Sequence, residues 1–485
     1  MTTTPTQTRQ SVLKLTTLTA ACERFGFYVI LCMIVLYTKA EFSFSDSDAF
    51  ELFAVIMALS YMLPMVGGYF ANNLFGVRRS LVLGLAVEGL GLFLLAIPVH
   101  FLFPFALAMV VIGAGLFKSA PIDLLEGSYK ENDQRVDSGF ALYYMGFNLG
   151  GFVSAVLTGI AERYFGWHMA FLVGGVSVFI GLLIYFFLRN SVTKLDSPIG
   201  KIKLSPKIWI VGISIILLAS FCCSFLLSHV AVNNILFTLM GIFLIGYYVY
   251  EMQKATHYDR MKIAACLLLI LIEVVYFVLY FQAYTSVELF IDRVVNRDFM
   301  GVVVPTEAYM GLNPILLIIL GPMLAFFYRK ISVKYGKDLS IMLKFALGLL
   351  VISVSFLTLV LGILVTESNT LVSSLWVIIA FCFYTLGEML VTAIGIVLVK
   401  DLVPEKMYGI AVGTWFFGCA LAALLSGWLA SFAGVADTMN DVHAILTIYQ
   451  SVFTKIGLAG LVVTAIVFLV GSYIKKMSEG NLAGN

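Results

Sequence analysis

Four charged side chains stand inside stretches of sequence that are otherwise apolar. Glu23 and Arg24 are neighbours in TAACERFGFYVI (19–30), Lys118 lies in GAGLFKSAPIDLL, and Glu388 lies in FYTLGEMLVTAIG. A charge at the centre of a membrane helix costs about 2.5–3.5 kcal/mol on insertion scales, so such residues normally face a water-filled cavity or a partner. Glu23 and Arg24 could simply pair with each other or with neighbouring helices, but that explanation fits Lys118 and Glu388 less well. The four residues are therefore the first candidates for binding a charged solute.

The composition of the chain is that of an integral membrane protein. Hydrophobic residues make up 61% of the 485 residues and charged residues only 12%, far from what a soluble domain needs to cover its surface. A net charge of +2, without a long block of like charge, argues against nucleic acid as a partner. The polar start MTTTPTQTRQSVLK runs into a full-length apolar segment without a small-residue cleavage site. We expect that segment to remain as the first membrane span.

About fourteen apolar runs are long enough to cross a bilayer as helices, which takes roughly 20 residues. They lie at 18–38, 50–73, 79–98, 101–125, 139–160, 167–188, 208–228, 231–251, 262–290, 309–328, 340–364, 372–399, 408–432 and 447–474. Because the runs are continuous rather than alternating, a closed β-barrel is excluded. Lysine and arginine gather in every second loop, for example at 189–207 and 254–262. The positive-inside rule then predicts a multi-pass membrane protein with both termini cytoplasmic.

Two similar loops indicate an internal repeat. GGYFANNLFGVRRSLVLG (67–84) follows the second span, and LAFFYRKISVKYGKDLSI (324–341) follows the tenth. Each is a short turn with a glycine, basic residues and a new apolar run, which favours two six-helix halves. The first loop also resembles the loop signature of the major facilitator superfamily. We predict an all-α membrane protein of that fold, with an N-terminal half at 1–190, a linker with an inserted two-helix hairpin at 191–261, and a C-terminal half at 262–485.

Such a repeat would place Lys118 and Glu388 on equivalent helices, the fourth and tenth of a twelve-helix core. The two helices would face one another across a central cavity, with cations in one half and an anion in the other. A zwitterion whose carboxylate and amine are separated by a short backbone fits this arrangement. The charges would then hold a charged solute and couple its passage to another event.

At these positions the chain resembles the proton-dependent oligopeptide transporters over nearly its whole length. ACERFGFY is similar to the first-helix signature ExxERFxYY, GGYFANNLFG to the GGxxADxxxG loop, GLFKSA to the fourth-helix lysine segment, and DSGFALYYMGFNLGG (137–151) to the fifth-helix FYxxINxG motif. LYFQAYTSVELF, GLNPIL, GEMLVTAIGI and VGTWFF resemble the seventh, eighth, tenth and eleventh core helices. Eight matches in the family's order are highly specific, whereas each one alone is weak.

The resemblance implies proton-coupled import of di- and tripeptides by alternating access, carried out by a monomer in membrane lipid without cofactor or metal. The family uses its basic pair for the peptide carboxylate, and its asparagines and glutamate for the peptide backbone and amine. The residues that would line the peptide site are Arg24, Tyr28, Tyr61, Lys118, Asn148, Asn313, Glu388 and Trp415. Outside the motif context, Tyr61, Asn148, Asn313 and Trp415 would be interpreted as helix packing or interfacial anchors.

The chain departs from the family pattern mainly at its acids. Ala20 stands at the first glutamate of the ExxER signature, and Gln282 stands where many members have an acidic residue. Smaller departures are Phe27, Asn72, Ser119 and Ala120.

Coupling needs a carboxyl group that is ionised in one state and neutral in another, beside a basic group that changes partner. Glu23 can act in this way with Arg24 and Lys118, as the family's network implies. Glu273 is a further intramembrane acid, which we include among the proton-coupling residues. For Glu88, a carboxyl that is packed neutral or paired near the third span is the favoured interpretation.

Other functions remain open at this stage. The seven cysteines lie in apolar runs without metal-site spacing, and we interpret them as small hydrophobic residues. The five histidines fall near span ends without a nucleophile, phosphate loop or metal-ligand set, which argues against an enzyme. Because of Ala20, the protein could be an uncoupled facilitator or a proton symporter of another small zwitterionic metabolite. A ligand-sensing receptor on a transporter scaffold is a third possibility, although the chain offers no long soluble domain for signalling.

Overall fold

The protein is a bundle of long helices. The computed structural model describes residues 5–130, 133, 135–336, 339–367, 370–392, 399–400, 402–436 and 438–478. The described part of the chain is 85% helical and contains thirteen helical segments that are long and apolar enough to span a membrane. The predicted all-α membrane fold is confirmed.

Contacts within the chain define two compact units. The first comprises 1–37, 55–230 and 307–315. The helices that lie wholly or mostly in it are α1 (Pro5–Phe42), α2 (Asp46–Phe70), α3 (Val77–Leu95), α4 (Phe103–Phe117), α5 (Ala120–Glu126), α6 (Val136–Phe165), α7 (Trp167–Leu188), α8 (Pro206–Ser228) and α12 (Thr306–Met310). A short π-helical turn, 71–75, continues α2.

The second unit comprises 38–54, 231–306 and 316–485. Its helices are α9 (Val230–Lys254), α10 (His257–Tyr280), α11 (Ser286–Val294), α13 (Leu312–Tyr335), α14 (Ile341–Leu364), α15 (Ser374–Val391), α17 (Tyr408–Ser431) and α18 (Val442–Ser478). Two-residue strands join its turns: β1 (Val295–Asn296) pairs in parallel with β4 (Val372–Ser373), and β2 (Asp298–Phe299) pairs antiparallel with β3 (Val302–Val303). The domain boundaries expected from the sequence follow chain order and stay a prediction.

Among the described residues, each of the fourteen predicted spans lies mostly in helix. Thirteen meet the length and hydropathy criteria for a membrane span, and the fourteenth is α3, which carries the three charged residues Arg78, Arg79 and Glu88. The fourth predicted span, 101–125, is not one continuous helix, because α4 ends at Phe117 and α5 begins at Ala120. The end of the twelfth predicted span, residues 393–398 of the GEMLVTAIGI segment, lies outside the described residues.

Local sequence explains where several helices begin. The side chains of Ser205, Thr256, Ser340 and Ser373 accept hydrogen bonds from backbone N–H groups in the first turns of α8, α10, α14 and α15. These N-caps satisfy donors that a helix start leaves unpaired. In lipid every backbone polar group needs an internal partner, so long apolar runs between such caps fold as helices.

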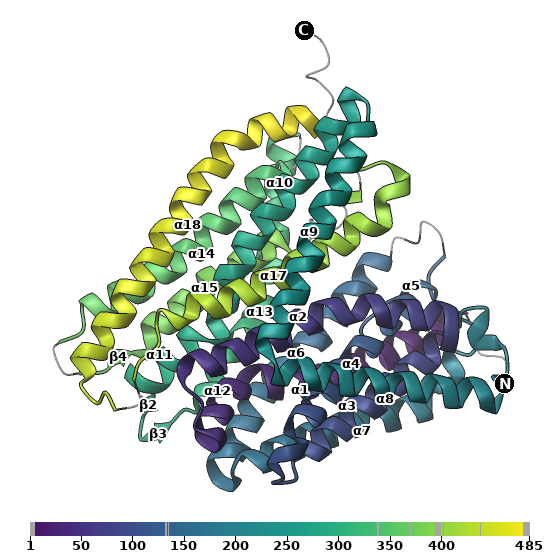
Figure 1. The fold of residues 1–485 in the computed structure, drawn as a ribbon, viewed down its shortest axis with the longest axis horizontal. Helices are drawn as coiled ribbons and strands as arrows, with labels where there is room; N and C mark the ends of the chain where they lie inside the picture. Colours follow the sequence, from purple (N-terminus) through teal and green to yellow (C-terminus); the bar gives the residue numbers. More distant parts are fainter. Residues whose placement is uncertain are drawn as a thin grey trace. The chain divides into compact units, whose positions relative to one another are not determined.

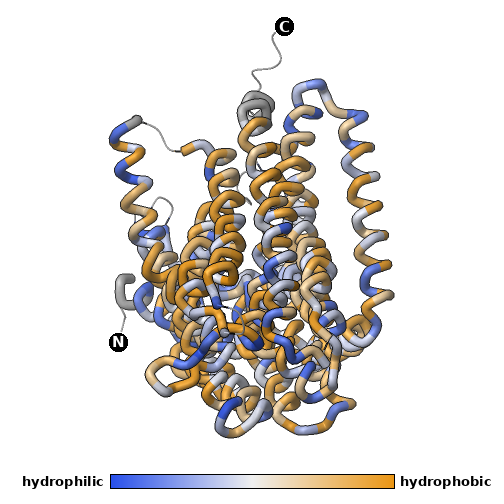
Figure 2. Tube along the Cα trace, turned by 90° about the vertical axis from the view of Figure 1, so that its left-hand side faces the viewer, coloured by the Kyte–Doolittle hydropathy of each residue, from blue (hydrophilic) through white to orange (hydrophobic). Residues whose placement is uncertain are grey.

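Glycines allow the helices to pack closely. A Cβ atom built on Gly67 of α2 would lie 2.1 Å from the backbone oxygen of Gly115 of α4, so only a glycine fits at this contact. In the second unit, α18 packs along α14, and the two helices run side by side in Figure 1. Figure 2 shows apolar residues along the helices and hydrophilic residues mostly at turns and helix ends, the pattern that a bilayer requires.

The inserted hairpin contributes one helix to each unit. α8 packs against α4, where the rings of Phe221 and Phe105 lie 4.8 Å apart between centroids. α9 packs against α17, where the hydroxyl of Tyr248 donates to the hydroxyl of Thr414 at 3.2 Å.

Candidate functional site

Arg24 is held between two aromatic rings in the first unit. Its guanidinium carbon lies 4.4 Å from the ring centroid of Tyr28, one turn along α1, and 4.5 Å from that of Phe147 on α6. Stacking on aromatic faces fixes the plane of a guanidinium. Tyr28 itself is 1% exposed, so the ring has little freedom to move.

Close packing of α6 on α1 creates this arrangement. A Cβ on Gly150 would lie 2.2 Å from the backbone oxygen of Ala21, and a Cβ on Gly151 would lie 3.1 Å from the ring of Tyr28. The hydroxyl of Ser154 donates to the backbone oxygen of Phe25 at 2.7 Å. The glycines of the FNLGG segment thus let the two helices touch, and their contact places Phe147 beside Arg24.

Lys118 stands at the break between α4 and α5. Its backbone N–H still bonds to the oxygen of Ala114, but the chain then turns, and Pro121 starts the next helix. The predicted fourth span is confirmed as a membrane-spanning segment, His100–Glu126, with this short break inside it; Pro121 has no N–H and cannot donate to the helical ladder. The Lys118 ammonium lies 5.2 Å from the ring centroid of Tyr61 on α2, and Lys118 is exposed.

Glu23 links the two cations. It is buried, with 6% of its surface exposed, and it interacts electrostatically with Arg24 and Lys118. The structure therefore brings together the three residues that the sequence grouped into one network. A buried carboxyl that interacts with two cations can exchange partners when either cation binds another anion.

The two predicted asparagines are also buried in the first unit. The amide of Asn148 donates to the backbone oxygen of Tyr144 in the same helix at 2.8 Å. Asn313, 1% exposed, lies in the segment 307–315, which packs on α6, where a Cβ on Gly311 would lie 3.2 Å from that of Ala155.

The second unit holds the remaining predicted residues. Glu388 on α15 is 9% exposed, and Trp415 on α17 is 4% exposed. Tyr384, one turn before Glu388, donates its hydroxyl to the backbone oxygen of Tyr280 at 3.1 Å, and the two rings stack 4.8 Å apart. Glu388 thus adjoins an aromatic wall that joins α15 to α10.

Glu273 and the Glu23 network belong to different units. Glu273 belongs to the second unit, is completely buried on α10, and accepts a hydrogen bond from the thiol of Cys419 on α17 at 2.8 Å. Its second carboxyl oxygen would be 3.3 Å from a Cβ placed on Gly418. Cys419 is therefore more than a small hydrophobic residue, because it also donates to a buried acid.

Gln282 has a structural environment in this chain. Its amide nitrogen donates to the backbone oxygen and to the hydroxyl of Ser426, both at 2.9 Å, and its amide oxygen accepts from Ser286 at 2.7 Å. Both ends of the amide are thereby used within the second unit. A neutral amide is suited to this position because it donates and accepts at the same time.

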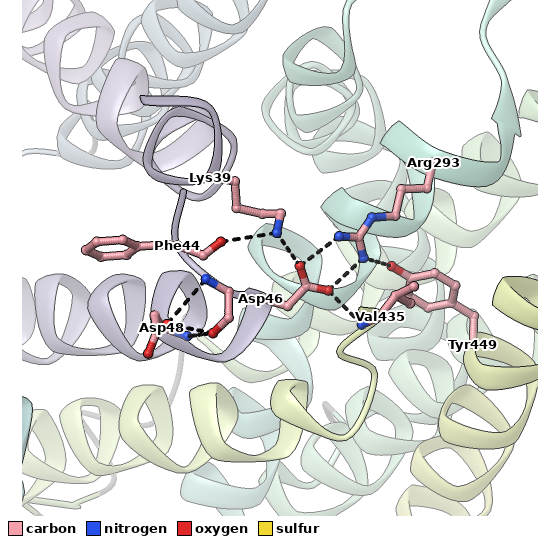
Figure 3. Close-up of polar contacts among 8 residues, drawn as sticks. Lys39, Phe44, Asp46, Asp48, Arg293, Val435 and Tyr449 are labelled. Carbon is pink, nitrogen blue, oxygen red and sulfur yellow. Dashed lines mark hydrogen bonds and ion pairs between the residues drawn. The ribbon is translucent and has the colours of Figure 1, made fainter. Parts of the chain in front are cut away.

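A polar cluster around Asp46 was not predicted from the sequence. The Asp46 carboxylate accepts from Lys39 at 2.7 Å, from both terminal nitrogens of Arg293 at 2.6 and 2.7 Å, and from the backbone N–H of Val435 at 2.9 Å, as Figure 3 shows. Arg293 also donates to the hydroxyl of Tyr449 at 3.4 Å. The cluster joins four segments of the second unit, and the only sequence signal was an acidic first turn in α2.

Phe147 and Tyr384 were also missed as site residues. Phe147 directly precedes Asn148 in the YYMGFNLGG segment, and Tyr384 stands four residues before Glu388. Tyr384 is one helical turn from Glu388, so helical spacing could have found it, whereas adjacent residues such as Phe147 and Asn148 do not share a helix face.

The fold and these sites define a class of protein, the secondary transporter built from membrane helices, with charged residues kept inside the bundle. Residues 78–446 match the model of the POT family, and this chain belongs to that family. The predicted family and the major facilitator fold are thereby confirmed.

Similar proteins of known sequence are bacterial permeases. The chain is 31% identical over 458 residues to dipeptide and tripeptide permease B of Salmonella typhimurium, covering 94% of this chain and 93% of that protein. It is 32% identical over 459 residues to permease B of Aeromonas hydrophila, covering 94% and 91%. A solved bacterial homologue of the human drug peptide transporters superposes with a TM-score of 0.87 at 27% identity, over 97% of this chain and 99% of that one.

Proposed function

We propose that this protein imports di- and tripeptides across the cell inner membrane, driven by protons, by alternating access of its two halves. The observation that carries the proposal is the adjacency of Arg24, Lys118 and the buried Glu23, framed by aromatic rings. The membership in the family and the permease relatives support it. Basic loops in every second position support cytoplasmic termini, and we propose a monomer as the functional unit.

The two cations are suited to a peptide carboxylate. Arg24 presents its N–H groups in a plane fixed by Tyr28 and Phe147, and Lys118 adds a mobile ammonium. A substrate carboxylate that binds them competes with Glu23 for the same positive charge. Protonation of Glu23 removes this competition, so proton binding and peptide binding favour one another. The proton gradient drives transport only if the proton and the peptide favour a conformation of the protein that differs from the one favoured without ligands.

The amine and backbone of the peptide need a different set of groups. We assign the amine to Glu388, a carboxyl group beside the aromatic wall of the second unit, and the backbone to Asn148 and Asn313. Tyr61 and Trp415 would complete the lining through their rings. These assignments follow the family's positions. A peptide without a free amine should therefore bind less tightly than one that has it.

The test is uptake of a labelled neutral dipeptide by the purified protein in liposomes, with and without an inward proton gradient. We expect accumulation that needs the gradient and is competed by unlabelled di- and tripeptides. Lys118→Ala should abolish gradient-driven uptake, whereas Lys130→Ala, an exposed lysine of the α5–α6 turn, should transport normally. Equal uptake by both variants would contradict the role of Lys118.

An uncoupled facilitator is the second candidate, because two acids of the family pattern are replaced by Ala20 and Gln282. Ala20 is completely buried, and both ends of the Gln282 amide are hydrogen-bonded. An acidic side chain at either position would therefore require its surroundings to rearrange. Equilibration of dipeptide that ignores the proton gradient would establish this function. Saturable peptide binding without any uptake would instead indicate a receptor.

A further inference from the structure

Glu88 is a buried carboxyl group that the proposed transport mechanism has not yet used. It lies in the middle of α3 and none of its surface is exposed. Neither of its carboxyl oxygens has a hydrogen-bond partner among the residues that the structure describes. An isolated carboxylate in an apolar interior carries a large desolvation cost, which is relieved when the group is paired or takes up a proton.

Glycines on two neighbouring helices bring α3 close at this residue. A Cβ on Gly26 of α1 would lie 3.1 Å from the Oε1 atom of Glu88, and a Cβ on Gly113 of α4 would lie 2.3 Å from its backbone nitrogen. Gly26 follows Glu23 by three residues, so the two positions share one face of α1. The carboxyl of Glu88 therefore lies against α1 within one turn of Glu23.

The charged groups around Glu88 come from α1 and its neighbours. Glu88 interacts electrostatically with Glu23 and Arg24, and Glu23 in turn interacts with Lys118. Tyr143 of α6 interacts with the same Glu23 and Arg24. The thiol-bearing Cys22 of α1 packs on Gly181 of α7. Val178 of α7 contacts Gly26 of α1, and Gly113 of α4 faces the backbone of Glu88.

We propose that Glu88 is a second proton-binding site, which lies against α1 one helical turn from Glu23 and supplies the carboxyl that Ala20 lacks. The proposal rests on the proton-coupled transport proposed above. Two neighbouring carboxyl groups resist being ionised together, so ionisation of one favours a proton on the other. When the O–H bond of a protonated Glu23 breaks, the proton forms an O–H bond on the Glu88 carboxylate, and no charge is created in the interior.

This transfer has a consequence for the cations. A protonated Glu23 leaves Arg24 and Lys118 to the peptide carboxylate, whereas an ionised Glu23 pairs with them again. While Glu88 holds the proton, the ionised Glu23 can pair with the two cations again and displace the peptide carboxylate. The proton does not first have to be released to water. The Glu23–Glu88 pair thus lies one helical turn further along α1 than a pair of carboxyl groups at positions 20 and 23 would lie.

The test compares Glu88→Gln with wild type in liposomes, with the membrane potential held at zero. A gradient of about one pH unit supports roughly tenfold accumulation of a neutral dipeptide per coupled proton. We expect accumulation by Glu88→Gln to fall to near onefold, while peptide exchange without a gradient stays within about twofold of wild type. Glu126→Gln, at the exposed end of α5, should accumulate peptide normally.

The pH profile separates a proton site from a packing role. Glutamine has the shape of a neutral glutamic acid, so a merely structural Glu88 predicts that Glu88→Gln keeps the wild-type pH dependence of uptake. That result would overturn the proposal. If Glu88→Gln is not recovered from the membrane, Glu88→Asp retains a carboxyl, and we expect it to accumulate peptide with a displaced pH optimum. An unchanged optimum in Glu88→Asp would count against the site.

The two proposals fail in different ways. If wild-type protein ignores the proton gradient, the coupled function itself is refuted. If wild type responds and Glu88→Gln responds equally, only the role of Glu88 is refuted. Infrared difference spectra across a pH step give an independent measurement. Compared with wild type, the spectrum of Glu88→Gln should lack one protonated-carboxyl band, and the spectrum of Glu126→Gln should keep that band.

Discussion

The Asp46 cluster allows a stability prediction that can be worked from its geometry. Asp46 is 3% exposed, while the side chains of Lys39 and Arg293 are 16% and 17% exposed. Breaking a fully buried pair costs about 3–5 kcal/mol, and exposed pairs contribute about 0–1 kcal/mol. Because water reaches the two cations but hardly reaches the carboxylate, we expect Asp46→Asn to destabilise the second unit by about 2–4 kcal/mol.

Asp48→Asn is a matched control in the same helical turn. Asp48 is exposed and bonds only to the backbone nitrogen and hydroxyl of Ser45 among the interactions that the structure describes. Both aspartates occupy the first turn of α2, so both substitutions remove the same favourable interaction with the helix dipole. The difference between the two variants therefore isolates the contacts with Lys39, Arg293 and Val435.

The assay is thermal unfolding of the purified protein in detergent, followed by tryptophan fluorescence. The expected cost corresponds to a fall of about 4–8 °C in the unfolding midpoint of Asp46→Asn relative to Asp48→Asn. Equal midpoints for the two variants would refute the reasoning. Exchanging the pair, as Asp46→Arg with Arg293→Asp, should not restore stability, because Lys39 and the N–H of Val435 would then face a cation.

Three further predictions follow from single contacts. Gly67→Ala should destabilise the first unit by about 1–3 kcal/mol, because its Cβ would collide with the backbone of Gly115. The control Gly68→Ala should be neutral, because its Cβ meets only the Ser119 hydroxyl at 3.8 Å. Equal midpoints of the two variants in thermal unfolding would contradict this prediction. Arg24→Lys should raise the KM for a neutral dipeptide about tenfold, since an ammonium cannot reproduce the planar fork, and an unchanged KM would exclude a role for that plane. Glu388→Ala should weaken inhibition of transport by peptides with a free amine and leave amine-blocked peptides unaffected; unchanged inhibition by free-amine peptides would disprove the amine assignment.

The sequence alone determined the membrane helices of this protein. The length of an apolar run and the need to satisfy backbone groups inside it are local properties, so the described residues of every predicted span lie mostly in helix. Ordered family motifs added the grouping of Glu23, Arg24 and Lys118, which the structure brings together.

Only the tertiary structure decided which side chains from distant segments meet. Residues 38–54 follow the first span in sequence yet pack with the second unit, where Asp46 finds Arg293. The sequence favoured a neutral or paired packing role for Glu88, and its position against Gly26 depends on how closely two helices approach. Helix packing is set by the shapes of all the surfaces in contact, which no local stretch of sequence encodes.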